Sequence, residues 1–333
     1  MFMTTPFRPN RRQFAALTAG AAATAVLPSL HAQTAAWPTK PVRLVLGFAP
    51  GGGSDVMARV LSQPMSDLLG QPVIVENRPG ASGNIATVDV ARAPADGYTL
   101  LFAPTTQITT SPHIFKMAID PAKDLIPIAS VGRYPLHLVS RTGLPFKTFQ
   151  EFLAYGRANP DKMSFASTGS GTVPHLVAEA MLKQAGIRAT HVPYKGSGPA
   201  LQAMLTGEVD FVIDPGVAFP HVRSGKLLLL ATAGSKRIPQ FPEVPMMKEA
   251  GLPKMDFYSW VGVYAPIGTP AAAMARISDV LSKTVNTPAV MEKFAGASAE
   301  GIYLNTPDFN SMIQGELQVF PALVKELNIK ADT

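Results

Sequence analysis

One stretch, residues 42–59 with the sequence VRLVLGFAPGGGSDVMAR, constrains the fold of this chain more than any other. Its apolar, partly β-branched start predicts a buried strand. The strand pattern breaks at residues 50–53, and a helix pattern begins at Ser54 or Asp55. Consecutive glycines let the backbone approach a ligand, and the unpaired N–H groups of the first helical turn lie at the positive end of the helix dipole. The stretch therefore predicts an anion cradle, with a plain tight turn as the alternative.

The first 32 residues predict an export signal peptide rather than a part of the fold. Arg11 and Arg12 precede a weakly apolar run rich in Ala, Thr and Gly over residues 15–27, and Ala32 offers a small residue at the expected cleavage point. The run is shorter than the roughly 18 residues that span a membrane. The arginine pair favours the twin-arginine export route over the general one. We therefore expect an exported protein in the periplasm.

Charge and cysteine content exclude several classes of protein. The whole chain has a net charge of +6, and removing the signal segment with its three arginines leaves 26 basic and 23 acidic residues, or +3. No basic stripe remains, so we expect no nucleic-acid partner. The chain has no cysteine, which excludes disulfides, thiol nucleophiles and thiolate metal ligands.

The sequence lacks the common catalytic motifs. Residues 51–55 and 169–174 lack the third glycine of GxGxxG, and neither GxxxxGK[ST] nor GxSxG occurs. The six histidines form no HExxH motif. Asp55 and Arg59, four residues apart, favour a surface or helix-start pair over an acid–base pair. We therefore expect no enzyme, with no catalytic residues, metal or cofactor, and keep an enzyme of unrecognised type as the least favoured alternative.

Strands and helices alternate from residue 37 onward, which predicts an α/β architecture. Glycine-rich turns follow four of the predicted strands, and a polar loop rich in hydroxyl and amide groups follows a fifth. These segments are residues 50–54, 79–83, 168–172 and 195–199, and the loop 104–107. Ligands in open α/β sheets gather outside the carboxyl ends of strands. We therefore expect these segments to face a ligand from two sides.

Two apolar, strand-like stretches predict where the chain crosses between domains, one within residues 126–140 and one at 257–265. The helices that follow the second crossing return to the first domain. The expected organisation is a first domain of residues 33–133 plus 260–333 and a second domain of residues 134–259.

Seven segments resemble, in order, the Bug family of periplasmic solute receptors, the binding components of tripartite tricarboxylate transport systems. They cover nearly all of the mature chain and read WPTKPVRLVLGFAPGGGSDVMAR, VENRPGASGNIATVDVARAPADGYTLL, FASTGSGTVPHL, HVPYKGSGPALQAMLTGEVD, SGKLLLLATAGSKR, PEVPMMKEAG and WVGVYAPIGTP. The resemblance implies a two-domain periplasmic binding protein, type II-like, with a hinge closing over a central cleft. We expect a monomer.

The resemblance also implies two walls of a ligand site. The first wall falls on Phe48, Ala49, Gly52, Asp55, Ser82, Thr105 and Thr106, and the second on Thr168, Gly169, Ser170, Gly171, His175, Tyr194, Gly196 and Asp214. His175 either faces the pocket or packs locally. Asp214 either favours a ligand with a cationic or donor group or points to solvent. We expect Ser170 and Thr172 to donate to the ligand and Lys195 to extend into solvent.

The expected function is capture of a small carboxylate, a carboxylic acid or an amino acid, in the interdomain cleft. The resemblance implies delivery to the membrane subunits of a tripartite tricarboxylate-type transporter. The alternative is a ligand-sensing receptor that signals to a membrane sensor kinase. The loop at residues 104–111 and the turn at 214–216 differ from the family pattern, so the sequence indicates the class of ligand and not its identity.

Overall fold

The computed structural model describes residues 37–331, and those from Pro38 onward belong to one compact unit. The expected signal peptide, its paired arginines and the cleavage point at Ala32 lie outside the described residues. Within residues 37–331, no helix is both long enough and apolar enough to cross a membrane.

A six-stranded mixed sheet has the strand order β11-β4-β10-β3-β1-β2. Its strands are β1 (Val42–Leu46), β2 (Val73–Asn77), β3 (Thr99–Pro104), β4 (Leu125–Pro135), β10 (Tyr258–Pro266) and β11 (Glu300–Leu304). β1 runs parallel to β2 and β3, whereas β10 is antiparallel to β3 and β4. The parallel strands aim the turns after β1, β2 and β3 at one edge of this sheet.

A five-stranded mixed sheet has the order β7-β6-β8-β5-β9. Its strands are β5 (His137–Arg141), β6 (Met163–Ser167), β7 (Ala189–Pro193), β8 (Phe211–Asp214) and β9 (Leu227–Thr232). β6 is parallel to β7 and β8, and β5 is antiparallel to β8 and β9. The turns after β6, β7 and β8 therefore leave this sheet at a common edge.

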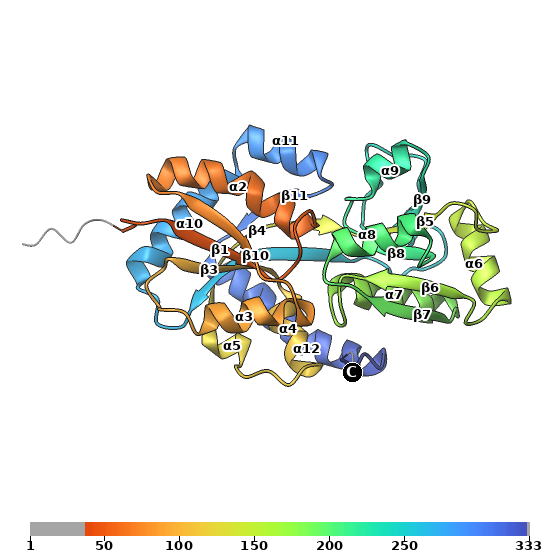
Figure 1. Cartoon of the computed structure of the whole chain (residues 1–333), viewed down its shortest axis with the longest axis horizontal. Coiled ribbons are helices and arrows are strands. Elements are labelled where there is room, and N and C mark those ends of the chain that lie inside the picture. The colour runs from red at the N-terminus through yellow and green to blue at the C-terminus, as the bar shows by residue number, and fades with distance from the viewer. Residues whose placement is uncertain (1–36, 332–333) are drawn as a thin grey trace, which may run out of the picture. The chain divides into compact units, whose positions relative to one another are not determined.

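The strands β4 and β10 connect the two sheets. They pair along most of their length, and Figure 1 shows them running side by side from the six-stranded sheet toward the five-stranded sheet. Only Leu136 separates the end of β4 from the start of β5. The predicted crossings fall on these strands, while the predicted domain boundaries stay a prediction.

Helices cover the six-stranded sheet on both sides. The described helices are α2 (Gly53–Leu69), η1 (Ala81–Gly83), α3 (Asn84–Ala91), α4 (Thr106–Thr109), η2 (Ser111–His113), α5 (Pro121–Asp124), α6 (Phe149–Ala158), α7 (Val173–Ala185), α8 (Ser197–Thr206), α9 (Phe219–Arg223), α10 (Ala271–Val285), α11 (Pro288–Gly296) and α12 (Thr306–Glu326). Val90 of α3 and Phe309 of α12 pack with Val45, Leu101 and Tyr264 of the sheet in one buried cluster. Figure 1 shows α2, α10 and α11 on the opposite side of this sheet.

The strand and helix predicted within residues 42–59 are confirmed within two residues. The predicted strand at residues 42–46 is β1, and the helix expected from Ser54 or Asp55 begins at Gly53. The spacing Thr-x-x-Glu at residues 148–151 predicts a capping box, and the structure has it: the Thr148 side chain accepts from the Glu151 N–H while the Glu151 carboxylate accepts from the Thr148 N–H.

Two elements differ from the sequence-based expectation. The second half of the polar loop expected at residues 104–107 belongs to the short helix α4, whose residues are all buried. The strand β11 was not expected, because its five residues are only half-buried and it pairs with β4 alone through an irregular register. Both elements depend on neighbours distant in the sequence, so local patterns do not reveal them.

Candidate functional site

A small cavity lies where the turn after β1 meets the turns after β6, β7 and β8. It is lined by Phe48, Gly52, Gly53, Ser54, Asp55, Pro104, Thr106, Tyr134, Thr168, Thr172, Val173, Pro174, Ser197, Pro215 and Ser259. The space open to the centres of water molecules is about 20 Å³, which corresponds to about one water molecule. Larger hollows of about 410–460 Å³ lie elsewhere on the surface, and of the four glycine-rich turns only the 79–83 turn borders one of them, through Ala81.

Three helices begin at this cavity. Gly53 is the first residue of α2, Val173 of α7 and Ser197 of α8, and all three residues line the cavity. In the described chain, none of these helix starts has a side-chain cap. The N–H groups of their first turns are therefore left for another acceptor, at the positive ends of three helix dipoles. An anion is the group that such an arrangement favours.

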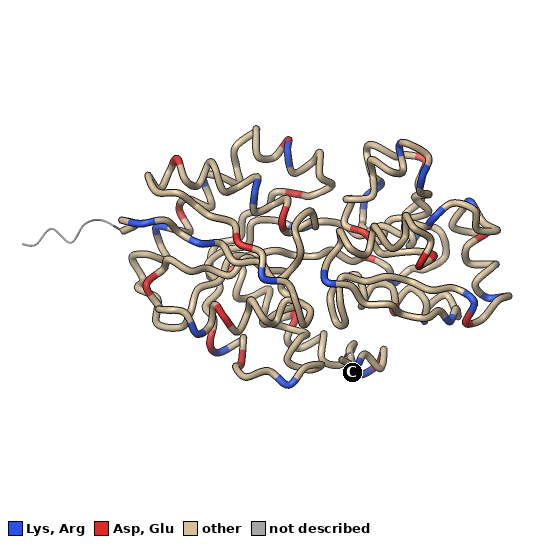
Figure 2. The backbone as a smooth tube through the Cα atoms, viewed as in Figure 1, with Lys and Arg blue, Asp and Glu red and all other residues tan. Residues whose placement is uncertain are grey.

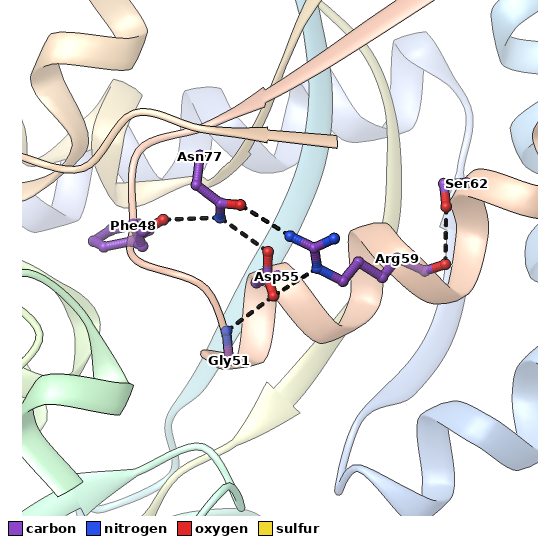
Figure 3. Close-up of polar contacts among 6 residues, drawn as sticks. All are labelled: Phe48, Gly51, Asp55, Arg59, Ser62 and Asn77. Atoms are coloured by element: carbon purple, nitrogen blue, oxygen red, sulfur yellow. Dashed lines mark hydrogen bonds and ion pairs between the residues drawn. The ribbon is translucent and has the colours of Figure 1, made fainter. Parts of the chain in front are cut away.

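Asp55 organises the turn after β1, as Figure 3 shows. One carboxylate oxygen accepts from the Gly51 N–H at 2.9 Å and from Arg59 Nε at 2.9 Å, and the other accepts from Asn77 Nδ2 at 2.9 Å. Asn77 also donates to the Phe48 carbonyl at 3.0 Å. The predicted helix-start pair of Asp55 and Arg59 is thus confirmed, and the carboxylate links both ends of the glycine turn.

The environment of Asp55 keeps its carboxylate ionised. Burial alone would raise the pKa of Asp55, but the hydrogen bonds from Arg59, Gly51 and Asn77 outweigh burial and hold the pKa below its ordinary value. Among residues 37–331, no lysine or arginine lines the cavity. Figure 2 shows the lysines and arginines distributed along the chain rather than gathered in one patch. The helix dipoles and the hydroxyl groups of the cavity wall are therefore the main groups that favour an anion in the cavity.

The turn after β6 is held by its own hydrogen bonds. Thr172 Oγ1 donates to the Gly169 carbonyl at 2.7 Å, and Thr168 Oγ1 donates to Thr172 Oγ1 at 2.9 Å. The Gly169 N–H donates to Ser167 Oγ at 3.1 Å. These contacts fix the shape of the turn before any ligand arrives.

The walls touch each other beside the cavity. The Ala49 N–H donates to the Lys195 carbonyl at 3.1 Å. Gly169 has φ +127°, and a Cβ added there would lie 2.7 Å from Ser82 Oγ. Gly196 has φ +134°, and a Cβ there would lie 3.2 Å from the Ala49 nitrogen. Glycine is therefore needed at 169 and 196 for both the backbone conformation and the close approach.

Most of the predicted site residues occupy three kinds of position. Those that line the cavity are Phe48, Gly52, Asp55, Thr106 and Thr168. Those at contacts between the walls are Ala49, Ser82, Gly169 and Gly196. Thr105, Ser170 and Gly171 are buried in the same turns without lining the cavity. Lys195 is exposed.

Three predicted residues have side chains engaged elsewhere. His175 is buried behind the turn after β6, where its Nδ1 accepts from the Gly171 N–H at 3.1 Å. The Tyr194 hydroxyl donates to Glu208 Oε1 at 2.7 Å. The Asp214 carboxylate is 1 % exposed and accepts from the N–H groups of Gly216 and Ala218 in its own turn.

Several cavity residues were not predicted, and Ser54, Tyr134, Ser197 and Ser259 are the polar ones. Tyr134 lies at the end of β4 and Ser259 at the start of β10, so both reach the cavity from the strands that connect the sheets. Burial raises the pKa of Tyr134. The predicted crossings could have indicated these residues, because a strand that links two sheets passes beneath the space between them.

A test follows from the burial of Asp214, which raises the pKa of this carboxyl to about 6, although backbone hydrogen bonds lower it in part. Because the folded pKa exceeds the ordinary value, the folded state binds more protons between about pH 4 and 6, and its stability rises as the pH falls. Asp214→Asn keeps an acceptor oxygen without the charge. We expect urea unfolding to show the variant more stable at pH 8 by roughly 2–3 kcal/mol, with the difference vanishing near pH 4. A pH-independent difference would contradict the buried charge as its cause.

Comparison with known proteins decides the family. The sequence model of a family described as "Tripartite tricarboxylate transporter family receptor" matches residues 57–329. The chain belongs to this receptor family. "Protein BugT" of Bordetella pertussis is 35 % identical over 302 residues, which are 88 % of this chain and 91 % of that protein. The predicted relationship to the Bug receptors is therefore confirmed.

Solved structures of receptors share the fold. "R. palustris Rpa4515 with adipate" is 30 % identical with a TM-score of 0.85, covering 89 % of this chain and all of that one. "MatC (Rpa3494) from Rhodopseudomonas palustris with bound malate" is 32 % identical with a TM-score of 0.81, covering 86 % of this chain and all of that one. This receptor is accordingly a periplasmic solute-binding protein with an α/β fold of two mixed sheets. Its family and fold are those of substrate-binding proteins rather than enzymes.

Proposed function

We propose that this receptor binds a small carboxylate in the cavity between the turns after β1 and β6 and delivers it to the membrane subunits of a tripartite tricarboxylate transporter. The convergence of three uncapped helix starts in the described chain supports a carboxylate as the ligand. The adipate and malate in the two related structures support the same chemical class. The description of the family supports delivery to a transporter.

Dipoles and hydroxyls hold the charge in this proposal. An unpaired carboxylate in a closed cleft would be costly, and no basic side chain among residues 37–331 lines the cavity to pair with it. N–H groups of α2, α7 and α8 meet the charge, since hydrogen bonds to an ionised acceptor are about twice as strong as neutral ones. The Ser197 hydroxyl, which lines the cavity, adds a further donor.

The ligand enters by separation of the two walls. A cavity that admits about one water molecule is too small for a dicarboxylate. We place the hinge in β4 and β10, the strands that connect the two sheets. The moving parts in this proposal are the predicted domains, residues 33–133 plus 260–333 and residues 134–259.

Calorimetric titration of the mature protein tests the ligand class. Adipate and malate, each compared with its uncharged diamide, separate recognition of the carboxylates from recognition of the carbon chain. We expect binding of at least one dicarboxylate and at least hundredfold weaker binding of the matching diamide. Equal affinity for acid and diamide, or a non-carboxylate found by mass spectrometry in protein recovered from the periplasm, would contradict the proposal.

Two substitutions, made separately, test which groups of the protein bind the negative charge of the ligand. Ser197→Ala removes a hydroxyl donor from the cavity wall, and we expect about five- to hundredfold weaker binding, since losing one donor costs about 1–3 kcal/mol. Lys195→Gln removes an exposed positive charge two residues away, and we expect a change of less than about threefold. A large loss for Lys195→Gln with none for Ser197→Ala would show a salt bridge in place of dipoles and hydroxyls.

A further inference from the structure

Two stacked histidines lie behind the turn after β6, which we define as the 167–172 turn. The rings of His175 on α7 and His191 on β7 have centroids 3.7 Å apart and planes inclined by 15°. His191 also stacks on Phe165, with centroids 4.9 Å apart. Neither histidine is among the described residues that line the cavity. Their contacts are therefore with the 167–172 turn rather than with the cavity.

His175 is bonded directly to the backbone of the turn. The Gly171 N–H donates to His175 Nδ1 at 3.1 Å. A ring nitrogen that accepts a hydrogen bond carries no proton, so the proton of neutral His175 lies on Nε2. Nε2 is 3.7 Å from a carboxylate oxygen of Glu179, which is too far for a hydrogen bond. A second proton on Nδ1 would set a donor against the Gly171 N–H and break this contact.

His191 reaches the same turn through Ser167. Its Nε2 lies 2.6 Å from Ser167 Oγ, and this hydroxyl accepts from the Gly169 N–H at 3.1 Å. The two imidazoles therefore support the turn at Gly169 and Gly171. These glycines have φ of +127° and +74°, a backbone region that is sparsely populated and needs support from its surroundings.

The surroundings of His191 favour its neutral form. Burial, with a smaller contribution from the adjacent His175, lowers the pKa of His191 to about 3. Facing the pair, Glu179 on α7 is the charged group that the structure places in contact with it, and Phe165 on β6 and Ser167 carry no charge. The pKa of His191 in the ordered turn is below its ordinary value near 6.5, so an opened turn binds a proton more readily. The ordered turn therefore loses stability relative to the opened turn as the pH falls below about 6.5.

We propose that His175 and His191 are positioning residues which, as a neutral stacked pair, hold the 167–172 turn in its ligand-binding shape and release it as the pH falls. The consequence for affinity rests on the proposed function. The effect on the turn itself does not, so the two are tested separately.

Amide hydrogen exchange, measured by NMR on the ligand-free protein, tests the effect on the turn. Between pH 8 and 5.5 we expect the opening equilibrium of the Gly169 and Gly171 amides to rise up to about tenfold, beyond the intrinsic change in exchange rate. The control is the double variant His175→Asn, His191→Gln, whose side-chain amides can accept or donate a hydrogen bond in place of His175 Nδ1 and His191 Nε2 without titrating. We expect the opening equilibrium of this variant to be independent of pH. Other titrating groups, including Asp214, Glu316 and His137, are the same in both proteins.

His175→Leu completes the test by removing the acceptor and keeping an apolar side chain. We expect Gly171 to lose protection at least tenfold at pH 8, and a carboxylate that binds the wild type to bind this variant more weakly at the same pH. A double variant with the pH dependence of the wild type, or a His175→Leu variant with unchanged Gly171 protection, would overturn the proposal. If no carboxylate binds the wild type, the proposed function fails while the exchange results still decide the role of the histidines.

Discussion

Replacing Gly169 with alanine is expected to weaken carboxylate binding by roughly ten- to hundredfold. The backbone at Gly169 has φ +127°, which a residue with a Cβ adopts only at a cost of about 1–3 kcal/mol. The added Cβ would also lie 2.7 Å from Ser82 Oγ and 3.3 Å from Ser82 Cα, across the contact between the two walls. The turn must therefore move away from Ser82, which shifts the donors that start α7.

Gly186→Ala is the matched control for the Gly169 prediction. Gly186 ends the same helix α7 with φ +68°, and a Cβ there would meet nothing within 4 Å. We expect this variant to lose stability but to bind as the wild type does in calorimetry. If Gly169→Ala binds within about threefold of the wild type, the approach of the 167–172 turn to Ser82 is not part of the bound state.

Asp55→Ala is expected to lower the free energy of unfolding by roughly 2–4 kcal/mol. The carboxylate is 4 % exposed and accepts hydrogen bonds from Gly51, Arg59 and Asn77, and charged hydrogen bonds contribute about 1.5–3 kcal/mol each without being additive. The expected loss of stability is smaller than the sum of these contributions, because the Arg59 side chain is 52 % exposed and becomes hydrated when its partner is removed. We expect weaker ligand binding as well, because the turn that starts α2 loses its anchor.

The pH dependence of this loss has a defined sign. Because the pKa of Asp55 is held below its ordinary value of 3.8, its contribution is fully present above that value and disappears as the pH falls through the folded pKa. Urea unfolding followed by circular dichroism should show a constant difference from pH 5 to 8 and a smaller one below pH 4. Asp279→Ala, which breaks exposed ion pairs with Lys283 and Arg276, is the control and should change stability within error. A loss below 1 kcal/mol for Asp55→Ala would show that the turn does not depend on this carboxylate.

The sequence by itself determined the elements that surround the site. An apolar run closed by glycines predicts β1 at its observed bounds, and Thr148 with Glu151 predicts the start of α6. These signals are local, because strand burial, glycine turns and helix caps depend on residues a few positions apart. The order of the motifs also indicated the receptor family, which the comparison of the whole chain confirmed.

Only the tertiary structure decided which of those residues act together. Asp55 gains Asn77, 22 positions away, as a partner, and the 167–172 turn meets Ser82 through a contact that no local pattern encodes. Tyr134 and Ser259 reach the cavity because β4 and β10 connect the two sheets. His175, expected either in the pocket or packed locally, stacks on a histidine 16 positions away and supports the turn from behind. Contacts of this kind arise from the packing of one sheet and its turns against another, and that packing is a property of the whole chain rather than of any segment.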